Sequence, residues 1–588
     1  MEQKKKRVYR KRIPYGMMNF EDVRKDDCYY VDKTPFIEEI EAANKFFFYI
    51  RPRRFGKSLT LSMLQNYYDV NKKDKFEQLF GDLYIGKNPT PERNSFLVLN
   101  LNFSVVAAGI DDYKDGLDAT CNMAYNFFCD VYQQYLPENI KEKMNKQEGC
   151  INQLQYICEV CDKVGQQIYL FIDEYDHFTN KILAEPQYMT GYCKQTHGEG
   201  YLRLFFDAVK AATSTSLKRV FVTGVSPVTM DDLTSGFNIG TNYSLSAEFN
   251  EMTGFTEEEV REMLTYYSSV CPFRHSVDEL IQVMKPWYDN YCFAEEEYGK
   301  TTMYNSVMVL NFLDKYIRNN YDIPKNMVES NVRIDYDKVR MLIRHDKEFT
   351  HDASIIQQLV TQGFVTGKLV ENFPAERIND PDNFLSLLFY FGMVTIDGDY
   401  KGATKFIIPN EVVRDQMYTY LLDTYKENDL TYDSFNKGKL ESQLAYDGNY
   451  KAYFEFIADS LKRYSSQRDK QKGEAFVHGF TLAMTSQNQF YRPISELDND
   501  GGYADIFLSP LCDIYKDMVD SYIIELKYSK TNTADEQLQV LFKEASAQIC
   551  RYANSDIVKE SVKTTKLHKL VVIYRGAEMI MCEEVTEE

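Results

Sequence analysis

The stretch KFFFYIRPRRFGKSLTLSMLQNYYDV, residues 45–70, decides the fold of the first part of the chain. Five consecutive apolar and aromatic residues after Lys45 predict a buried strand, and the apolar spacing after Lys57 predicts a helix. The loop between them ends in Gly-Lys-Ser. A strand, such a loop and a helix form a P-loop, in which backbone N–H groups and the positive end of the helix dipole surround phosphate groups.

Each residue type in this loop has a chemical task. Lys57 is expected to reach the β and γ phosphates of ATP, Ser58 to hold Mg²⁺, and Gly56 to let the backbone approach the phosphates. Arg51 stands where the usual pattern has its first glycine, so the entry of the loop must turn in another way. The residues predicted to bind the nucleotide in this segment are Arg53, Arg54, Phe55, Gly56, Lys57, Ser58 and Leu59.

Further apolar runs predict a mostly parallel α/β sheet around this strand. They alternate with helical stretches up to about residue 225 and read SFLVLNLNF, QIYLFIDEY and RVFVTGVS. The second run ends in two acids: Asp173 is expected to hold the magnesium ion, and Glu174 to polarise an attacking water molecule. The polar strand ends Thr223 and Ser226 are candidate sensors of the γ phosphate. A buried strand with an acidic exit is the alternative, but the combination with the loop favours nucleotide binding and leaves hydrolysis open.

Two strands near the C-terminus, GYADIFL and YIIELK, carry a second set of charged residues. Because side chains alternate along a strand, Glu525 and Lys527 project from one face. Asp505 on the adjacent strand completes the predicted cluster. Two carboxylates chelate a divalent cation such as Mg²⁺ or Mn²⁺, which lowers the pKa of a bound water molecule, and a lysine orients that water.

Helices on either side of this hairpin extend the predicted site. Glu474 in the preceding helix is expected to add a carboxylate, and Gln548 in the following helix to position substrate or water. On spacing alone, a cross-strand ion pair on an exposed hairpin is an equal alternative. The order of a helix with an acid, a strand with Asp, a strand with Glu-x-Lys and a helix with Gln favours an intact metal site.

The length and the net charge of the chain limit how many domains it forms and how it could bind nucleic acid. A chain of 588 residues exceeds one hydrophobic core and predicts several domains. The formal net charge of −20 argues against coating nucleic acid over the whole surface, so any nucleic-acid site must be local. The clearest basic run is expected to be a solvated tail and comprises Lys4, Lys5, Lys6, Arg7, Arg10, Lys11 and Arg12.

Cysteine spacing and hydropathy add two expectations. The only CxxC pair, Cys158 and Cys161, lacks the second half of a zinc site, so we expect no structural zinc there. The chain has no apolar segment typical of a secretory signal or a membrane span. We therefore expect a cytoplasmic protein that does not act in a membrane.

The patterns divide the chain into four parts: a basic tail at 1–13, a P-loop domain at 14–254, a helical region at 255–430 and a terminal domain at 431–588. The helical region is predicted to begin with Thr256 as an N-cap. Within it, FLSLLFYFGMVTI, DGDYKG and KFIIP predict a helix and a small hairpin. A winged-helix-like element and a packed helical connector explain that pattern equally well.

At these residues the chain resembles a bacterial family in which an AAA-ATPase-like domain is fused to a C-terminal PD-(D/E)XK nuclease domain. The likeness is carried by IPYGMMNFEDVRKDDCYYVDKT, RPRRFGKSL, FIDEYD, FVTGVSPV, GFTEEEV, WYDNYCF and the pair GYADI and YIIELK. The resemblance implies a P-loop ATPase of the additional-strand catalytic-glutamate type, a helical region and a restriction-endonuclease-like domain. It also implies that Arg51 belongs to the family's own pattern.

Matching positions assign roles to individual residues. The resemblance implies that the nucleotide site contains Lys57, Ser58, Asp173 and Glu174. It also implies that the nuclease centre contains Asp505, Glu525 and Lys527. The expected function is that of an ATP-binding, ATP-regulated, metal-dependent nuclease of DNA in defence or mobile-element conflict. A nucleotide-dependent switch or scaffold that binds nucleic acid or a partner without cutting is the alternative, and a simple ATPase with a packing domain is a third. The choice between DNA and RNA, a homo-oligomeric state and ATP turnover stay open.

Overall fold

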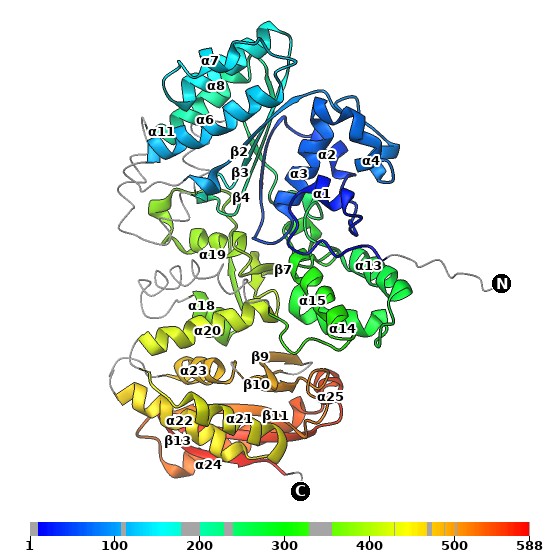
Figure 1. Cartoon of the computed structure of the whole chain (residues 1–588). Coiled ribbons are helices and arrows are strands. Elements are labelled where there is room, and N and C mark those ends of the chain that lie inside the picture. The colour runs from blue at the N-terminus through cyan, green and yellow to red at the C-terminus, as the bar shows by residue number, and fades with distance from the viewer. Residues whose placement is uncertain are drawn as a thin grey trace, which may run out of the picture. The chain divides into compact units, whose positions relative to one another are not determined.

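The structure is a computed structural model of the chain. It describes residues 10–106, 113–177, 200–228, 239–328, 355–427, 430–466, 473–486, 488–499 and 502–586 (Figure 1). Contacts within the chain divide these residues into two compact units. The first comprises 10–322, 328 and 366–409, and the second comprises 323–327, 355–365 and 410–586. The predicted basic residues at 4–7 lie outside the described residues.

A five-stranded sheet forms the centre of the first unit, and its order is β2-β3-β4-β1-β5. All neighbouring strands in it run parallel, so the predicted parallel sheet is confirmed. Every residue of β3 is buried, which explains the continuous apolar run in its sequence. The strands are β1, Phe46–Ile50; β2, Leu97–Asn102; β3, Ile168–Asp173; β4, Leu217–Gly224; and β5, Thr241–Asn242.

Helices cover this sheet in two groups, which Figure 1 shows on either side of it. The group that includes the helix after the P-loop packs on an aromatic layer of the sheet, for example through Tyr68 of α3, whose ring centre lies 5.0 Å from that of Tyr169 in β3. This group comprises α1, Phe20–Lys25; α2, Phe36–Ala42; α3, Lys57–Tyr68; α4, Phe76–Phe80; and α5, Tyr84–Lys87. The other group comprises α6, Tyr113–Val131; α7, Ile140–Met144; α8, Gly149–Lys163; and α11, Tyr201–Ala212.

The first unit continues into the region predicted to be helical. Thr256 caps α13 through a capping box with Glu259, as predicted from the sequence. The predicted helix and hairpin are also confirmed, since α19 precedes the antiparallel pair of β7 and β8. The elements are α13, Glu257–Val270; α14, Val277–Tyr288; α15, Ser306–Arg318; α19, Pro381–Tyr390; β7, Thr395–Tyr400; and β8, Ala403–Ile407. The winged-helix likeness and the four domain boundaries stay predictions.

The second unit is built on a mixed sheet with the order β13-β12-β11-β10-β9. Only β11 and β12 pair in parallel, and α24 and α25 lie between them in sequence. The apolar face of α24 packs on this sheet through Leu538, Ala545 and Ile549. The strands are β9, Tyr491–Asn499; β10, Gly502–Pro510; β11, Asp520–Ser529; β12, Lys566–Arg575; and β13, Glu578–Glu584.

Helices complete the second unit before and after the hairpin of β10 and β11. The predicted order of helix, two strands, helix and strand is present, with β9 and β13 as additional edge strands. The helices are α18, Ile355–Thr361; α20, Glu411–Glu427; α21, Ser434–Asp447; α22, Tyr450–Ser466; α23, Glu474–Ser486; α24, Asp535–Tyr552; and α25, Asp556–Val562. A short strand, β6, Phe364–Gly367, pairs in the sheet order β6-β8-β7.

The CxxC pair is part of the packing of α8. Cys158 and Cys161 are both buried. Burial raises the pKa of both thiols, to about 12 for Cys158, which disfavours the thiolate form that binds metal. Among the helices of the described ranges, none has the length and apolar character needed to cross a membrane.

We predict that Thr256→Ala lowers the free energy of unfolding by about 1 kcal/mol, because the capping hydroxyl is lost from the first turn of α13. Equilibrium urea unfolding of the full chain measures this change. Thr265→Ala is the matched control: Thr265 is exposed within the same helix, and alanine there should leave stability unchanged or slightly higher. Equal loss in both variants would contradict a specific capping role.

Candidate nucleotide and metal sites

The parallel register brings four strand ends to one edge of the first sheet. Ile50 at the end of β1 pairs with Gly224, and Asn102 at the end of β2 pairs with Asp173. The loop leaves β1 at this edge, and α3 begins at Lys57. Gly56 has a φ of 89°, a left-handed conformation that suits glycine, immediately before the helix. The predicted strand, loop and helix are therefore present at the carboxyl edge of a parallel sheet.

The ammonium group of Lys57 lies within its own loop. Its Nζ donates hydrogen bonds to the carbonyl oxygens of Arg51 and Pro52, at 2.8 and 2.9 Å. Burial lowers the pKa of Lys57 to about 8, and the nearby Asp173 carboxylate opposes that shift. The ammonium group expected to reach phosphate is therefore bound to backbone oxygens of its own loop.

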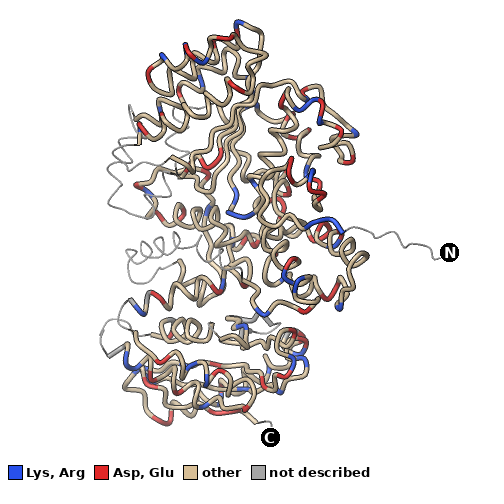
Figure 2. Tube along the Cα trace, viewed as in Figure 1, with Lys and Arg blue, Asp and Glu red and all other residues tan. Residues whose placement is uncertain are grey.

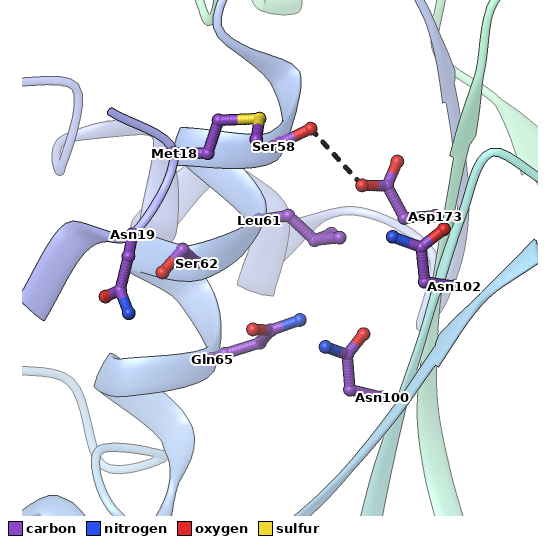
Figure 3. Close-up of a pocket in the computed structure, with 9 residues that line it drawn as sticks. All are labelled: Met18, Asn19, Ser58, Leu61, Ser62, Gln65, Asn100, Asn102 and Asp173. Atoms are coloured by element: carbon purple, nitrogen blue, oxygen red, sulfur yellow. Dashed lines mark hydrogen bonds between the residues drawn. The ribbon is translucent and has the colours of Figure 1, made fainter. Parts of the chain in front are cut away.

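The two predicted magnesium ligands of this unit are neighbours. The Ser58 hydroxyl donates to Oδ2 of Asp173 at 3.3 Å, as Figure 3 shows. The Asp173 carboxyl is poorly solvated, and this burial raises its pKa. Mg²⁺ in nucleotide sites is held by one or two carboxylates together with phosphate oxygens. A hydroxyl and a carboxylate in contact beside the loop fit that donor set.

A pocket of about 240 Å³ extends from this pair along α3. Figure 3 shows polar side chains from α3 facing asparagines of β2 across it. Its lining residues include no Lys or Arg and are Met18, Asn19, Ser58, Leu61, Ser62, Gln65, Asn100, Asn102 and Asp173. Sites for drug-sized ligands usually measure about 300–1,000 Å³. The pocket is therefore smaller than such sites, and its lining includes Ser58 and Asp173 but no cationic side chain.

Glu174 follows Asp173 in a left-handed conformation, with a φ of 51°. Its side chain is 43% exposed, and its Oε2 lies 3.8 Å from Nδ1 of His177. This interaction lowers the pKa of Glu174 and so keeps the carboxylate ionised, the form that a general base requires. The structure thus leaves Glu174 accessible and charged beside the two metal-ligand candidates.

The candidate γ-phosphate sensors bind backbone groups instead of facing the pocket. The Thr223 hydroxyl donates to the Tyr49 carbonyl at 2.8 Å, and the Ser226 hydroxyl accepts from the Val228 N–H at 3.3 Å. Both side chains are buried. A role at the γ phosphate would require each hydroxyl to leave its partner. Sequence reasoning missed Asp176, which ties the ends of β3 and β4 by accepting hydrogen bonds from the Val225 and Ser226 N–H groups.

The remaining loop residues divide by environment. Arg53 and Arg54 are partly buried, and Phe55 is fully buried. Leu59 packs against the aromatic core under α3, so its side chain does not face the pocket. Of the predicted nucleotide-binding residues, the structure brings only Ser58 and Asp173 into the lining of the pocket.

In the second unit, the pairing of β10 with β11 brings the predicted acids together. Ile506 is opposite Ile524, so Asp505 lies beside Glu525 one position further along. Oδ2 of Asp505 accepts the Leu526 N–H at 2.7 Å, and Lys527 Nζ lies 2.7 Å from Oε1 of Glu525. The three residues predicted from strand alternation therefore form one cluster.

Electrostatics in this cluster favour a bound cation. Glu525 is 2% exposed, and its Oε2 is buried and makes no hydrogen bond with the residues that the structure describes. Burial, followed by the charge of Asp505, raises the pKa of Glu525 to about 7, although Lys527 opposes the shift. A buried oxygen without a donor, next to a second carboxylate, is a group that a divalent cation would satisfy.

The described part of the chain contains no group of three or more His, Cys, Asp or Glu side chains that could hold a metal ion. The protein would therefore supply two carboxylates here, and water or substrate phosphate would complete the shell. That number is sufficient for Mg²⁺, which retains several water ligands in most sites.

The flanking helices contribute to this site to different degrees. Glu474, at the start of α23, is exposed, and its charge helps to raise the pKa of Lys527. Gln548 on α24 has a buried Oε1 that lacks a partner among the described residues. Sequence reasoning missed His478, whose Nε2 donates to the backbone carbonyl of Asp505 at 3.0 Å. Its spacing of four residues from Glu474, which puts both on one helix face, was the available signal.

Comparison with known families matches two separate regions of the chain. Residues 14–234 match a family described as predicted AAA-ATPase, and residues 472–584 match the PD-(D/E)XK nuclease superfamily. The two domains expected from the sequence resemblance are thus confirmed. Among curated proteins, an uncharacterized protein in the vnfD 5′ region of Azotobacter chroococcum mcd 1 is 25% identical over 289 residues. That alignment covers 49% of this chain and 50% of the relative, so it spans about half of the relative's length.

Two solved structures align with much of the chain at low similarity. Cdc6p from Pyrobaculum aerophilum is 11% identical, with 72% of this chain and 97% of that chain covered and a TM-score of 0.25. The ORC2 protein of Aeropyrum pernix is 10% identical, with 66% and 93% covered and a TM-score of 0.29. Similarity at this level carries no argument about function.

We predict that metal binding to the second unit strengthens as the pH rises through about 7. The raised pKa of Glu525 means that a proton occupies this carboxyl below that pH, and a metal ion must displace it. The apparent Mn²⁺ affinity should rise about tenfold per pH unit below 7 and level off above it. Calorimetric titration at several pH values measures this, and Glu525→Gln should remove the step. A flat profile would contradict the assignment.

We also predict that His478→Leu weakens Mn²⁺ binding about tenfold, because the Asp505 backbone loses its donor from α23. His478→Gln is the matched variant: its amide N–H can take the place of Nε2–H, and most of the affinity should return. Thermal unfolding of both variants monitors the fold. Equal affinity in His478→Leu and the unchanged protein would show that this hydrogen bond does not position Asp505.

Proposed function

Because this chain joins a predicted AAA-ATPase domain to a PD-(D/E)XK nuclease superfamily domain, we propose that it is an ATP-regulated, metal-dependent nuclease that hydrolyses DNA phosphodiester bonds. One observation carries the proposal: the Glu525 carboxyl is buried beside Asp505 and Lys527, and its Oε2 accepts no hydrogen bond within the described part of the chain. An ordinary ion pair on an exposed hairpin would be solvated and would not raise the pKa of a carboxyl to about 7.

Each residue of the cluster has a task in the proposed hydrolysis. Asp505 and Glu525 would hold Mg²⁺ or Mn²⁺, and the Leu526 N–H fixes the Asp505 carboxylate. The bound cation supplies Lewis acidity and lowers the pKa of a water molecule. Lys527 retains 21% exposure of its side chain, so its ammonium group can reach a substrate phosphate and stabilise developing negative charge.

The first unit provides the regulatory half of the proposal. Lys57 would bind the β and γ phosphates of ATP, while Ser58 and Asp173 would hold Mg²⁺. Glu174, accessible and ionised, is the candidate base for ATP hydrolysis. We propose that the state of this site controls the nuclease domain.

Charge limits the proposed contact with DNA. Figure 2 shows acidic and basic residues interspersed along the described parts of both units, and the whole chain has a formal charge of −20. A duplex would therefore be bound locally, at the nuclease centre, instead of along a broad surface. A cytoplasmic role in conflict with phage or mobile-element DNA is the setting we propose.

A nucleotide-dependent switch that binds nucleic acid without cutting is the second candidate. It is favoured by the state of Lys57, whose ammonium group binds two carbonyl oxygens of its own loop and so gives the loop a self-bound arrangement. A switch requires two such arrangements but no hydrolysis. Nucleotide-dependent assembly without any cleavage product would favour this candidate.

The direct test is cleavage by the full chain and by Asp505→Asn. Supercoiled plasmid and circular single-stranded DNA are incubated with Mg²⁺ or Mn²⁺, in the presence of ATP, ADP or no nucleotide. We expect nicking or degradation by the unchanged protein and none by Asp505→Asn, because the substitution removes a metal-binding carboxylate. Asp513→Asn is the matched control, since Asp513 is an acid of the same unit that pairs with Lys563 at the surface.

Two results would overturn the nuclease proposal. The unchanged protein would be inactive with every combination of metal, nucleotide and DNA, or Asp505→Asn would cut as fast as Asp513→Asn. The second result would indicate a contaminating nuclease or a cutting centre elsewhere in the chain.

A further inference from the structure

The segment WYDNYCF, residues 287–293, lies outside both regions matched by the family models. In the structure it comprises the last two residues of α14 and the five that follow, and it belongs to the same compact unit as the P-loop. Two of its rings, Tyr291 and Phe293, are buried and nearly parallel, with an interplanar angle of 13°. We call this pair the aromatic platform. It contacts both ends of the phosphate loop.

Arg51 joins the entry of the loop to the platform. Its guanidinium carbon lies 4.3 Å from the centre of the Phe293 ring and 4.4 Å from the centre of the Tyr49 ring, so the cation is held between two aromatic faces. The group is 1% exposed and donates to the carbonyl oxygens of Ile50, Ser244 and Phe249. The residue at the usual glycine position is therefore directed inward and binds the fold.

Phe55 joins the other end of the loop to the same platform. Its ring meets Tyr291 edge-on at a centroid distance of 4.8 Å and Phe293 edge-on at 5.3 Å. Edge-to-face contacts at these distances are the favoured arrangement of aromatic pairs. Phe293 thus contacts both Arg51 and Phe55. The loop residues between them, 52–54, therefore span a fixed distance.

Hydrogen bonds from the same region set the direction of the loop peptides. The Arg54 carbonyl accepts from the Ser306 hydroxyl at 3.3 Å and from the Val307 N–H at 3.4 Å, and the Phe55 carbonyl accepts from the Gly254 N–H at 2.8 Å. A trans peptide is planar, with its C=O and N–H on opposite sides. Carbonyls held toward Gly254 and α15 therefore direct the N–H groups of Phe55 and Gly56 away from them, into the loop.

We infer that the aromatic platform, with the donors at Gly254, Ser306 and Val307, positions the phosphate loop for nucleotide and is part of the nucleotide site. This rests on the proposed nucleotide binding of the first unit. Phe293 and Tyr291 are positioning residues, because they contact the loop and not the nucleotide. A P-loop depends on N–H groups that point at phosphate, so loss of the platform releases those groups and weakens binding without removing any phosphate ligand.

The test compares Phe293→Leu with Phe312→Leu in the full chain, using titration with a fluorescent ATP analogue. Phe312 is equally buried in α15 of the same unit, and its ring contacts Tyr288 and Tyr316 instead of the loop. We expect about tenfold weaker binding in Phe293→Leu, because aromatic and cation–π contacts are lost, and little change in Phe312→Leu. Phe293→Tyr keeps the ring face and should restore binding to within about threefold of the unchanged protein.

A second variant covers the case in which Phe293→Leu does not fold. Ser306→Ala removes only the hydroxyl donor to the Arg54 carbonyl, and we expect it to weaken nucleotide binding about threefold. Absence of nucleotide binding in the unchanged protein would overturn the proposed function. Binding by the unchanged protein together with unaltered binding by Phe293→Leu or Ser306→Ala would overturn the inference alone. Equal loss in Phe312→Leu would also overturn it, by showing a general effect of core damage.

Discussion

The burial of the Arg51 guanidinium is the constraint on which the first unit depends. A cation with 1% exposure is costly unless its environment replaces water, and no carboxylate is among its hydrogen-bond partners. Three backbone carbonyls and two aromatic rings replace the solvent. They come from β1, from the segment after β5 and from the segment after α14, so these segments must assemble around the side chain together. The position of the phosphate loop follows from that assembly.

The second unit also buries an ionisable group, but it places a second group of the same charge beside it. Glu525 is nearly as inaccessible to solvent as Arg51. Its Oε2 accepts no hydrogen bond from the described residues, and the neighbouring Asp505 carboxylate repels it. The strand pairing and the bond from Leu526 hold the two carboxylates together in spite of this repulsion. Among the described residues, one buried polar atom in each group makes no hydrogen bond, Nε of Arg51 and Oε2 of Glu525, but only Glu525 lies beside a group of its own charge. A carboxyl perturbed in this way is typical of a ligand site.

Local patterns allowed much of this to be predicted. The strands β1, β3 and β4 were predictable because burial on both faces requires apolar residues throughout, although β2 alternates between buried and exposed residues. Thr256 was predictable because a capping box is local. The approach of Asp505 to Glu525 followed from strand alternation. The partners of Arg51 and the contact of His478 with Asp505 were not predictable, because they join segments distant in sequence. Thr223 was predicted to sense the γ phosphate because its strand end is polar, but in the folded chain its hydroxyl donates to the Tyr49 carbonyl.

The self-bound state of Lys57 has a consequence for how a nucleotide would enter. The Lys57 ammonium group already donates hydrogen bonds to two carbonyl oxygens. A phosphate group would therefore have to compete with these oxygens for the ammonium group. The measured nucleotide affinity would then reflect the difference between the contacts of Lys57 with phosphate and its contacts with the loop carbonyls. The association rate would include the time that the Lys57 side chain needs to turn outward. Such an arrangement would disfavour weakly bound anions, since an ion with one or two good contacts would gain little by displacing the two carbonyl oxygens from Lys57.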